Sequence, residues 1–352
     1  MEYFDSNPRP KQLDEHSEGA QAFIDQHARE HRRVALVTSG GTTVPLENQT
    51  VRFIDNFSAG TRGATSAEYF LEAGYAVIFL HRQFSLLPYS RHYSHTTNCF
   101  LDYMTHDERG AVVIDAEYRQ QMADVLAQYT KAKRENTLLI LPFTSVNEYL
   151  WYLRDLAILM QPLAANGLFY LAAAVSDFFV PADRMVEHKI QSSEEFNTKR
   201  QLSNGDDDNS NENLPAAHME GKKLVIDLDP VPKFLKQLVD AWAPRSMIIS
   251  FKLETDPSIL SEKCQSALKK YAHHLVIGNL LRTRKHEVLM VSARSGEKWL
   301  RVPTDRRTKS VTGLTGNGAE PVPAADPIEI ESLIIPEIKT LHSEVIAKGD
   351  PR

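Results

Sequence analysis

Short apolar runs alternate with amphipathic segments along most of the chain. Runs typical of buried strands cover residues 34–38, 76–80, 137–141, 168–177, 246–251 and 275–278. Continuous apolar runs of this kind suit parallel strands that are covered on both faces. Amphipathic patterns between them predict helices over 15–32, 64–71, 117–133, 145–165, 234–242, 257–274 and 328–347. The alternation predicts a single α/β domain, residues 1–352, on a mostly parallel sheet.

Three stretches interrupt this pattern. Two β-type runs, 286–293 and 298–303, predict a small hairpin outside the parallel sheet. Residues 193–221 are rich in Asn, Asp and Ser and predict a disordered acidic insert, since the spacing and closing glutamate of a calcium loop are missing. Residues 81–110 are rich in His, Tyr, Ser and Arg, and the histidines lack metal-type spacing, which favours a solvated loop.

Composition and charge narrow the classes of function. The hydrophobic content of 42% and charged content of 24% are ordinary for a soluble protein. No window approaches about 18 uninterrupted apolar residues, and no signal peptide is readable, so no membrane partner is expected. A net charge of −6 argues against a nucleic-acid surface. Cys99 and Cys264 are too few for a disulfide framework or a zinc site, which favours a cytoplasmic location and leaves a nuclear one open.

Two loops with anion-binding character follow the first strand. Gly40 and Gly41 end that strand, where the missing Cβ lets backbone amides approach an oxyanion. The second loop, residues 58–63, opens a helix whose free N–H groups and positive dipole end face the same cleft. Each loop alone fits a plain tight turn about as well, and neither is a dinucleotide fingerprint or a P-loop. The pair predicts a phosphorylated ligand.

The apolar run 168–177 ends in a polar carboxyl end, where ligands of open α/β sheets usually bind. Residues 172–174 are alanines, small enough for a planar group to pack against the backbone. Asp177 follows at the position where chemistry is expected, although an N-cap role is its plain alternative.

Six sequence blocks, in order, resemble the eukaryotic branch of the phosphopantothenate–cysteine ligases. They are Ser39–Leu46, Val51–Gly60, Ala172–Phe178, Glu187–Ser193, Ile249–Asp256 and Asn279. The resemblance extends from about residue 34 to residue 294 and is poor over 81–133 and 193–221. Six blocks in the right order are far more specific than either loop alone.

The resemblance implies a three-layer fold with Rossmann-like and ribokinase-like features, usually in a homodimer. It implies the second step of coenzyme A synthesis from pantothenate, in which 4′-phosphopantothenate and L-cysteine give 4′-phosphopantothenoylcysteine, AMP and pyrophosphate through an acyl-adenylate. Bacterial relatives use CTP and carry a flavin-dependent decarboxylase, for which this chain has no room. ATP with Mg²⁺ is therefore the expected co-substrate.

The same resemblance implies the roles of individual residues. Lys189, on a mobile flap, is expected to offset charge at the α-phosphate. Asn56 is expected to contact the activated acyl group and to serve the attack by cysteine, whereas a turn role is its plain alternative. The substrate contacts expected in these blocks are Gly40, Gly41, Thr42, Arg52, Asn56, Ser58, Ala59 and Gly60.

The nucleotide site is expected at the later blocks. Phe251 is expected to pack on the base or ribose with the alanines opposite, and Asp177 to bond the nucleotide or a magnesium-bound water. The full expected set is Ala173, Ala174, Asp177, Lys189, Lys233, Phe251 and Lys252. Lys263 and Lys270 share a helix face and either meet the triphosphate or are solvated. Neither cysteine is expected to act as a covalent nucleophile.

Two other classes of function remain open from the sequence. A nicotinamide- or flavin-dependent oxidoreductase would need an acidic residue after the second strand, and residues 79–82 offer none. A nucleotide-binding regulatory paralogue without catalysis would keep the fold and lose the chemistry, against which Asn56, Lys189 and Asp177 speak.

Overall fold

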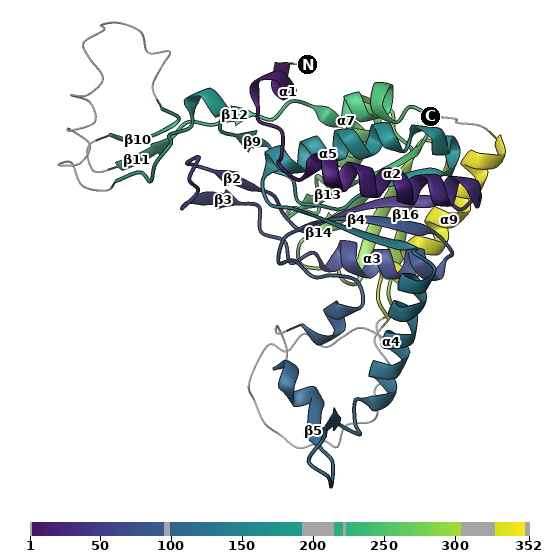
Figure 1. Cartoon of the computed structure of the whole chain (residues 1–352). Helices are drawn as coiled ribbons and strands as arrows, with labels where there is room; N and C mark the ends of the chain where they lie inside the picture. Colours follow the sequence, from purple (N-terminus) through teal and green to yellow (C-terminus); the bar gives the residue numbers. More distant parts are fainter. Residues whose placement is uncertain (1, 95–98, 192–214, 221–222, 304–327, 349–352) are drawn as a thin grey trace, which may run out of the picture.

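The centre of the protein is an eight-stranded sheet with the order β16-β15-β14-β13-β8-β1-β4-β7. The computed structural model describes residues 2–94, 99–191, 215–220, 223–303 and 328–348 (Figure 1). The strands from β7 to β14 are parallel. They are β1 (Val34–Ser39), β4 (Ala76–Arg82), β7 (Leu138–Phe143), β8 (Gly167–Leu171), β13 (Met247–Glu254) and β14 (Leu275–Leu280). The predicted α/β class with a mostly parallel sheet is confirmed.

The strand order reverses between β1 and β8. From β1 the chain builds outward through β4 and β7, and then returns to the other side of β1 with β8, β13 and β14. In sheets of this kind, ligands bind outside the carboxyl ends of the strands at the point of reversal. The loops that follow β1 and β8 are therefore the place to look for a site.

Helices cover both faces of the sheet and give three layers (Figure 1). Alternate residues of β1 enter different hydrophobic clusters, Val34 and Leu36 on one face and Ala35 and Val37 on the other. The first cluster includes side chains of α2 (Leu13–Arg29) and α5 (Val146–Leu159), and the second includes side chains of α3 (Thr61–Glu72) and α9 (Glu331–Lys348). Helix α8 (Leu260–Tyr271) packs on β14 and β15 in a third, smaller cluster.

The predicted hairpin forms outside the parallel strands, and it extends their sheet as an antiparallel edge. Strand β15 (Glu287–Ser292) pairs antiparallel with β14, and β16 (Gly296–Arg301) pairs antiparallel with β15. The reason is burial on two faces: Leu289 and Val291 pack in the cluster with α8, while Val288 and Met290 pack in the cluster with α3 and α9. A free hairpin would leave one of these rows in water.

Several predicted boundaries also change. Strand β8 ends at Leu171 rather than continuing to Asp177, because the following residues leave the ladder and bond to the loop after β1. Helix α5 ends at Leu159, and a 3₁₀ segment, η3 (Gln161–Asn166), follows with a proline in its first turn. The helix predicted over 234–242 is a short α-helix, α7 (Phe234–Gln237), that continues as a π-turn, η6 (Leu238–Trp242).

Small ribbons and short helices complete the structure. The β9–β12 and β10–β11 ribbons lie on the side of the β2–β3 hairpin, whereas β5 lies at the far end of α4 (Figure 1). The remaining elements are α1 (Glu2–Ser6), β2 (Thr43–Pro45), β3 (Phe53–Asp55), η1 (Ser90–Tyr93), η2 (Phe100–Tyr103), β5 (Met104–His106), β6 (Val112–Ile114), α4 (Arg119–Arg134), β9 (Phe178–Phe179), η4 (Ala182–Arg184), β10 (Ala217–Glu220), β11 (Lys223–Ile226) and β12 (Asp229–Pro230).

The predicted acidic insert, 193–221, needs a new boundary. Residues Ala217–Glu220 form β10, which pairs antiparallel with β11, so the end of the predicted insert is a strand. Residues 193–214 of the insert, including its acidic centre at 204–213, lie outside the described residues, as does residue 221. Within the described ranges, no helix has the length and apolar character needed to cross a bilayer.

Candidate active site

The loop after β1 and the segment after β8 are joined by backbone hydrogen bonds. The Ala174 amide donates to the Gly40 carbonyl at 2.8 Å, and the Thr42 amide donates to the Ala174 carbonyl at 3.0 Å. The Ser176 amide donates to Thr42 Oγ1 at 2.9 Å. The structure thus brings three predicted site residues, Gly40, Thr42 and Ala174, together at the reversal of the sheet.

The second predicted loop lies directly on the first. The Asn56 amide donates to the Thr42 carbonyl at 3.1 Å. A Cβ placed on Gly41 would lie 1.7 Å from the Asn56 carbonyl oxygen, a distance that no side chain can occupy. Gly41 is therefore required for close approach of the two loops, and this contact places Asn56 at the mouth of the crevice.

The amino end of α3 faces the same crevice. Gly60 is the N-cap residue with φ +84°, and no side chain caps the helix there. Ser39 Oγ donates to the Gly60 carbonyl at 3.0 Å and fixes this end of the helix to β1. Uncapped amides at a helix amino end bind anions through their N–H groups and the helix dipole. The uncapped end leaves these amides available, and anion binding at Ser58, Ala59 and Gly60 stays a prediction.

A turn that the sequence analysis treated as part of a surface loop forms a third wall. Ser85 Oγ lies 3.2 Å from where a Cβ would stand on either Gly40 or Gly60. The Leu86 amide donates to the Ala59 carbonyl at 2.9 Å, and Arg82 pairs with Asp55 at 2.6 Å. The one local signal for this turn was its position directly after the second predicted strand, next to β1 in the sheet.

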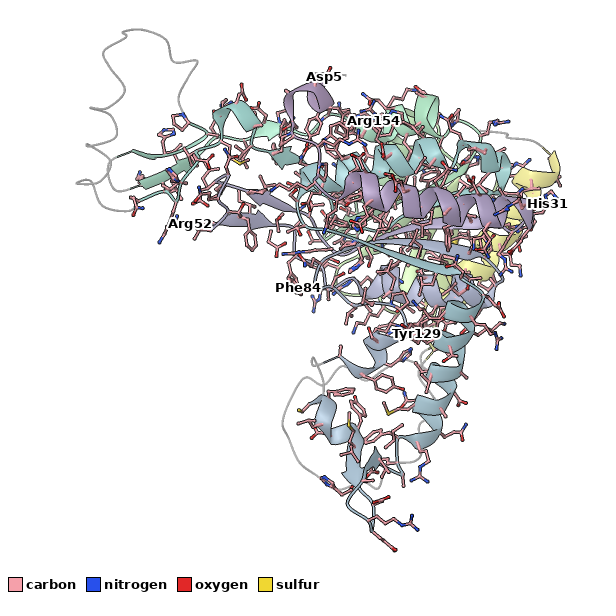
Figure 2. The ribbon with its side chains drawn as sticks, in the orientation of Figure 1. Asp5, His31, Arg52, Phe84, Tyr129 and Arg154 are labelled. Atoms are coloured by element: carbon pink, nitrogen blue, oxygen red, sulfur yellow. The ribbon has the colours of Figure 1, made fainter. Side chains whose placement is uncertain are left out.

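Exposed aromatic rings surround this third wall. Phe84 is 96% exposed at φ +68°, a backbone conformation that costs energy for a residue with a side chain, and Figure 2 shows it on the outside of the molecule. Phe57 is 83% exposed. The two rings line a cavity of about 570 Å³. Its further walls include Ser58, Ala59, Arg82 and Ser85. A pocket with both apolar walls and the anion loop suits a ligand with an organic chain and a phosphate.

Arg52 is engaged within the protein. It lies beyond the body of the sheet on the β2–β3 hairpin (Figure 2). Its Nη1 donates to Glu47 at 3.0 Å and to the Ile190 carbonyl at 3.0 Å. Glu47 is fully buried, which alone would raise the pKa of its carboxyl. The amides of Arg52, Val51 and Ile190 and the Arg52 guanidinium instead hold that pKa below its usual value. The predicted substrate contact of Arg52 stays a prediction.

Lys189 lies on the segment 186–190, which the Arg52–Glu47 pair contacts at Ile190. The Asn48 amide donates to the Val186 carbonyl at 2.9 Å, and the Gln49 amide donates to the Glu187 carbonyl at 3.1 Å. The segment 186–190 therefore runs beside the β2–β3 hairpin, and the Lys189 side chain is exposed. The structure brings Lys189 next to Arg52 in the fold, and its contact with a nucleotide stays a prediction.

The expected nucleotide residues after β8 are linked to Lys233. Thr38 Oγ1 accepts from the Ala173 amide at 3.2 Å, which ties that segment to β1. The Asp177 carbonyl accepts from the Val231 amide at 2.8 Å, so the segment also joins the strand that leads to Lys233. The side chains of Asp177 and Lys233 are both exposed. Ala173, Asp177 and Lys233 thus belong to one connected unit at the carboxyl edge.

Phe251 and Lys252 are neighbours in β13, and their side chains lie on opposite faces of the sheet. Phe251 packs edge-on against Tyr170, with ring centroids 4.9 Å apart, in the cluster of α3 and α9. Ala173 packs in the cluster of α2 and α5. The two side chains therefore contact different layers, and their predicted packing on opposite sides of a nucleotide stays a prediction. The charge of Lys252 acts on the buried thiol of Cys264 in α8, whose pKa burial raises to about 11.

The two further lysines of the sequence analysis lie on α8. Both are exposed, and Lys270 also stacks on Tyr271 at 5.4 Å. Helix α8 returns from the carboxyl edge of β13 toward the amino edge, so Lys270 lies about 10 Å farther from the crevice than Lys263 along the helix axis. Of the two, Lys263 is the one placed toward the site.

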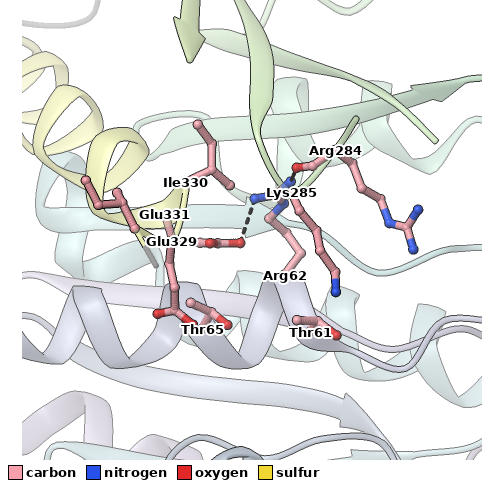
Figure 3. A pocket seen from close by; sticks show the side chains of 9 residues that line it. Thr61, Arg62, Thr65, Arg284, Lys285, Glu329, Ile330 and Glu331 are labelled. Carbon is pink, nitrogen blue, oxygen red and sulfur yellow. Dashed lines mark hydrogen bonds and ion pairs between the residues drawn. The ribbon is translucent and has the colours of Figure 1, made fainter. Parts of the chain in front are cut away.

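Arg62 is a residue that sequence reasoning missed, although it stands within the quoted second loop. From the first turn of α3 it reaches Glu331 Oε1 at 2.6 Å and the carbonyl of Arg284 (Figure 3). It also donates to Asn279 Oδ1 at 3.4 Å. Burial raises the pKa of the Glu331 carboxyl, while Arg62 opposes that effect. Arg62 thereby ties Asn279 of β14 to the amino end of α3, beside a cavity of about 240 Å³.

Asp177 is the residue predicted to contact a magnesium ion carried by a nucleotide, and that contact stays a prediction. No cluster of three or more His, Cys, Asp or Glu side chains lies within metal-binding reach in the described ranges. Asp177 presents one exposed carboxylate at the crevice. Magnesium in nucleotide sites is commonly held by one or two carboxylates together with substrate phosphates and water.

Comparison with known proteins places this geometry in a family. No protein-family model matches the chain. The phosphopantothenate–cysteine ligase CAB2 of Saccharomyces cerevisiae is 47% identical over 351 residues, which cover 98% of this chain and 86% of that protein. The phosphopantothenate–cysteine ligase of Homo sapiens is 40% identical over 298 residues, covering 83% of this chain and 86% of that protein.

Solved structures give the same result. A Cab2 mutant in complex with phosphopantothenate-cysteine matches with a TM-score of 0.80 at 45% identity, covering 98% of each chain. A pantothenate-metabolism flavoprotein from Streptococcus pneumoniae matches with a TM-score of 0.51 at 19% identity, covering 88% of this chain and 99% of that chain, which shows a shared fold alone. The identity and coverage of the yeast and human relatives establish that the chain belongs to the phosphopantothenate–cysteine ligase family.

Proposed function

We propose that the chain joins 4′-phosphopantothenate to L-cysteine at the expense of ATP, giving 4′-phosphopantothenoylcysteine, AMP and pyrophosphate. The observation that carries the proposal is the contact of Gly41 with the Asn56 carbonyl, beside the uncapped end of α3 at the sheet reversal. That contact joins two blocks of the family resemblance into one crevice. The family implies a nucleotide co-substrate, and the resemblance to its eukaryotic branch favours ATP over CTP.

The first half-reaction activates the carboxylate. A carboxylate is a poor electrophile at neutral pH, so one of its oxygens attacks the α-phosphorus of ATP, and pyrophosphate leaves. Positive charge near the α-phosphate stabilises the added charge on the phosphate oxygens. Lys189 is the residue proposed for this task, and its exposed position on a segment beside the β2–β3 hairpin suits closure over a bound nucleotide. Magnesium, when bound with the nucleotide, supplies further charge neutralisation.

The second half-reaction forms the amide. The cysteine amine attacks the acyl carbon, the bond from that carbon to the AMP oxygen breaks, and the amine loses a proton. Asn56 is the residue proposed to hold the acyl group during this attack. Its backbone is fixed by the bond to Thr42 and by the contact with Gly41, so its side chain is presented from a rigid position. The anion-binding end of α3 is proposed to hold the phosphate of 4′-phosphopantothenate.

We also propose a homodimer in the cytoplasm, with the nucleus left open as a second location. The β2–β3 hairpin carries exposed apolar side chains, with Val51 56% and Phe53 49% exposed, which a second copy of the chain would cover. Light scattering coupled to size-exclusion chromatography measures the mass in solution. A monomer at all concentrations would contradict the dimer, and imaging of a tagged chain tests the location.

The deciding experiment is a side-by-side turnover measurement with ATP, CTP, GTP and UTP. Purified protein is mixed with 4′-phosphopantothenate and L-cysteine, and pyrophosphate and product are followed, the product by mass spectrometry. ATP should support the fastest turnover, and product should require cysteine. A regulatory paralogue without catalysis would bind nucleotide and form neither product. Faster turnover with CTP would keep the ligase reaction and overturn the choice of ATP.

A further inference from the structure

We propose that Tyr3 and Phe4, in the N-terminal helix α1, form a clamp that positions Asp177 and Lys233 for nucleotide binding. This N-terminal clamp lies outside every block of the family resemblance. The inference rests on the proposed function for its kinetic readout, and its structural readout is independent of that function. The clamp acts by holding the ribbon made of β9 and β12. Asp177 directly precedes β9, and Lys233 follows β12 by three residues.

The Tyr3 ring packs against one residue of the ribbon and one residue just after it. Its ring lies 5.1 Å from the Phe179 ring and 5.2 Å from the Phe234 ring, centroid to centroid. Phe179 is two residues after Asp177, and Phe234 directly follows Lys233. One buried ring therefore packs against the two aromatic neighbours of the predicted nucleotide residues.

Phe4 fixes the clamp to the body of the protein. Its ring lies 4.8 Å from Trp151 of α5 and 5.4 Å from Phe234. The Arg154 guanidinium lies over the Phe4 ring, 4.6 Å from its centroid. Figure 2 shows Arg154 on the same side of the molecule as Asp5 in α1. Aromatic and cation–π contacts of this geometry give both attraction and a defined orientation.

The ribbon depends on this support because it is very short. Strands β9 and β12 have two residues each and share two register pairs, Phe179 with Asp229 and Phe178 with Pro230. An isolated two-stranded ribbon is marginal in water even when it is longer. The hydrogen bond from the Val231 amide to the Asp177 carbonyl extends the pairing toward the crevice. A shift of the ribbon would therefore move Asp177 and Lys233 together.

A cavity beneath Tyr3 gives the ribbon room to shift. It has a volume of about 170 Å³ and lies between α1, β2, the start of α5 and the start of the Lys189 segment. Phe179, Met185 and Glu47 line it together with Tyr3. The Tyr3 hydroxyl is buried and has no hydrogen-bond partner among the described residues. The clamp accordingly needs the ring of Tyr3 and not its hydroxyl group.

Three variants test the clamp. Tyr3→Ala removes the ring, and Tyr3→Phe removes the hydroxyl alone. Phe23→Ala is the matched control, because Phe23 is also buried but belongs to α2, where its ring packs against His27. Tyr3→Leu replaces Tyr3→Ala if the alanine variant does not fold. For each variant, steady-state kinetics give the KM for nucleotide and the KM for 4′-phosphopantothenate. Hydrogen exchange is measured over residues 177–179 and 229–234. All measurements are made well below the Tm.

The clamp predicts a selective effect. Tyr3→Ala should raise the KM for nucleotide about tenfold through misplacement of its ligands, with the KM for 4′-phosphopantothenate unchanged. Amide exchange should become faster in the ribbon, and Tyr3→Phe should match the wild type in every measurement. Phe23→Ala should lower the Tm and change neither KM.

Opposite results would overturn the clamp. The clamp is ruled out if the ribbon amides of folded Tyr3→Ala exchange at the wild-type rate. It is also ruled out if Phe23→Ala raises the KM for nucleotide as much as Tyr3→Ala does. If the wild type makes no product, the proposed function fails, and the exchange data still decide whether the clamp exists.

Discussion

Replacing Gly41 by alanine should disable the enzyme while the protein stays folded. The added Cβ would lie 1.7 Å from the Asn56 carbonyl oxygen and 2.8 Å from its carbon, whereas ordinary contacts begin at 3.4 Å. The Asn56 backbone must therefore retreat by about 1.7 Å, since neither atom belongs to a flexible side chain. Overpacking of this kind costs about 1–3 kcal/mol of the free energy of unfolding. A shift of about 1 Å at a catalytic group costs roughly 100-fold in rate, so kcat should fall at least that far.

Gly19→Ala is the matched control for this substitution. Gly19 lies in α2 at an exposed position, and a Cβ there meets nothing within 4 Å. Alanine in a helix interior is favoured over glycine by about 0.5–1 kcal/mol, so this variant should be slightly more stable and fully active. Turnover is followed by pyrophosphate release and product mass, and stability by urea unfolding. Full activity in Gly41→Ala would refute the close contact and the role given to Asn56.

Three further predictions address charge and protonation. Lys189→Ala should abolish nucleotide-dependent pyrophosphate release and leave the Tm unchanged, because the side chain is exposed; equal release by variant and wild type would remove Lys189 from the first half-reaction. Asn56→Asp should let acyl-adenylate accumulate, detectable by mass spectrometry, because the new charge opposes attack by cysteine; full activity without accumulation would contradict this role. Burial lowers the pKa of His342 and of His273 to about 4 from an ordinary value of 6.5. Both rings are therefore buried in the neutral form, and folding opposes their protonation. Their contribution to the free energy of unfolding is complete above pH 6.5 and is lost as the pH falls toward 4, by up to about 3 kcal/mol per ring. Urea unfolding between pH 7 and 5 should therefore show a smaller loss in His342→Gln than in the wild type, and equal losses would refute the assignment.

The apolar pattern was sufficient to predict the sheet. Strands β1, β4 and β7 match the predicted runs closely, because strands buried between two helical layers must be apolar on both sides. The same pattern could not show that β15 extends the sheet, since a hairpin and a sheet edge have similar sequences. Pairing partners are decided by packing between residues far apart in the chain.

The candidate site was predicted where glycine or a family block marked it. Gly40, Gly41 and Gly60 stand at positions of close approach or positive φ, which leave a signal in the residue type itself. Ser85 and Arg82 left no such signal, because their role comes from contact with loops 25 or more residues earlier in the chain. The engagement of Arg52 with buried Glu47 was also invisible, since a glutamate in a loop predicts exposure.

The nucleotide wall shows a third limit. The sequence predicts Asp177 at the carboxyl end of an extended strand. In the structure Asp177 lies at that edge of the sheet, but in the irregular segment that follows Leu171. An apolar run does not reveal where its backbone leaves the ladder, because the residues that leave it remain partly buried against the neighbouring loop.

The central claim is that the carboxylate is activated as an acyl-adenylate at this crevice. It is tested most directly by turnover with 4′-phosphopantothenate whose carboxylate carries a heavy oxygen isotope, followed by mass spectrometry of the nucleotide product. Attack of that carboxylate on the α-phosphorus and later release of AMP should place one labelled oxygen in AMP. Label in inorganic phosphate, with ADP as the nucleotide product, would show an acyl phosphate instead and contradict the account.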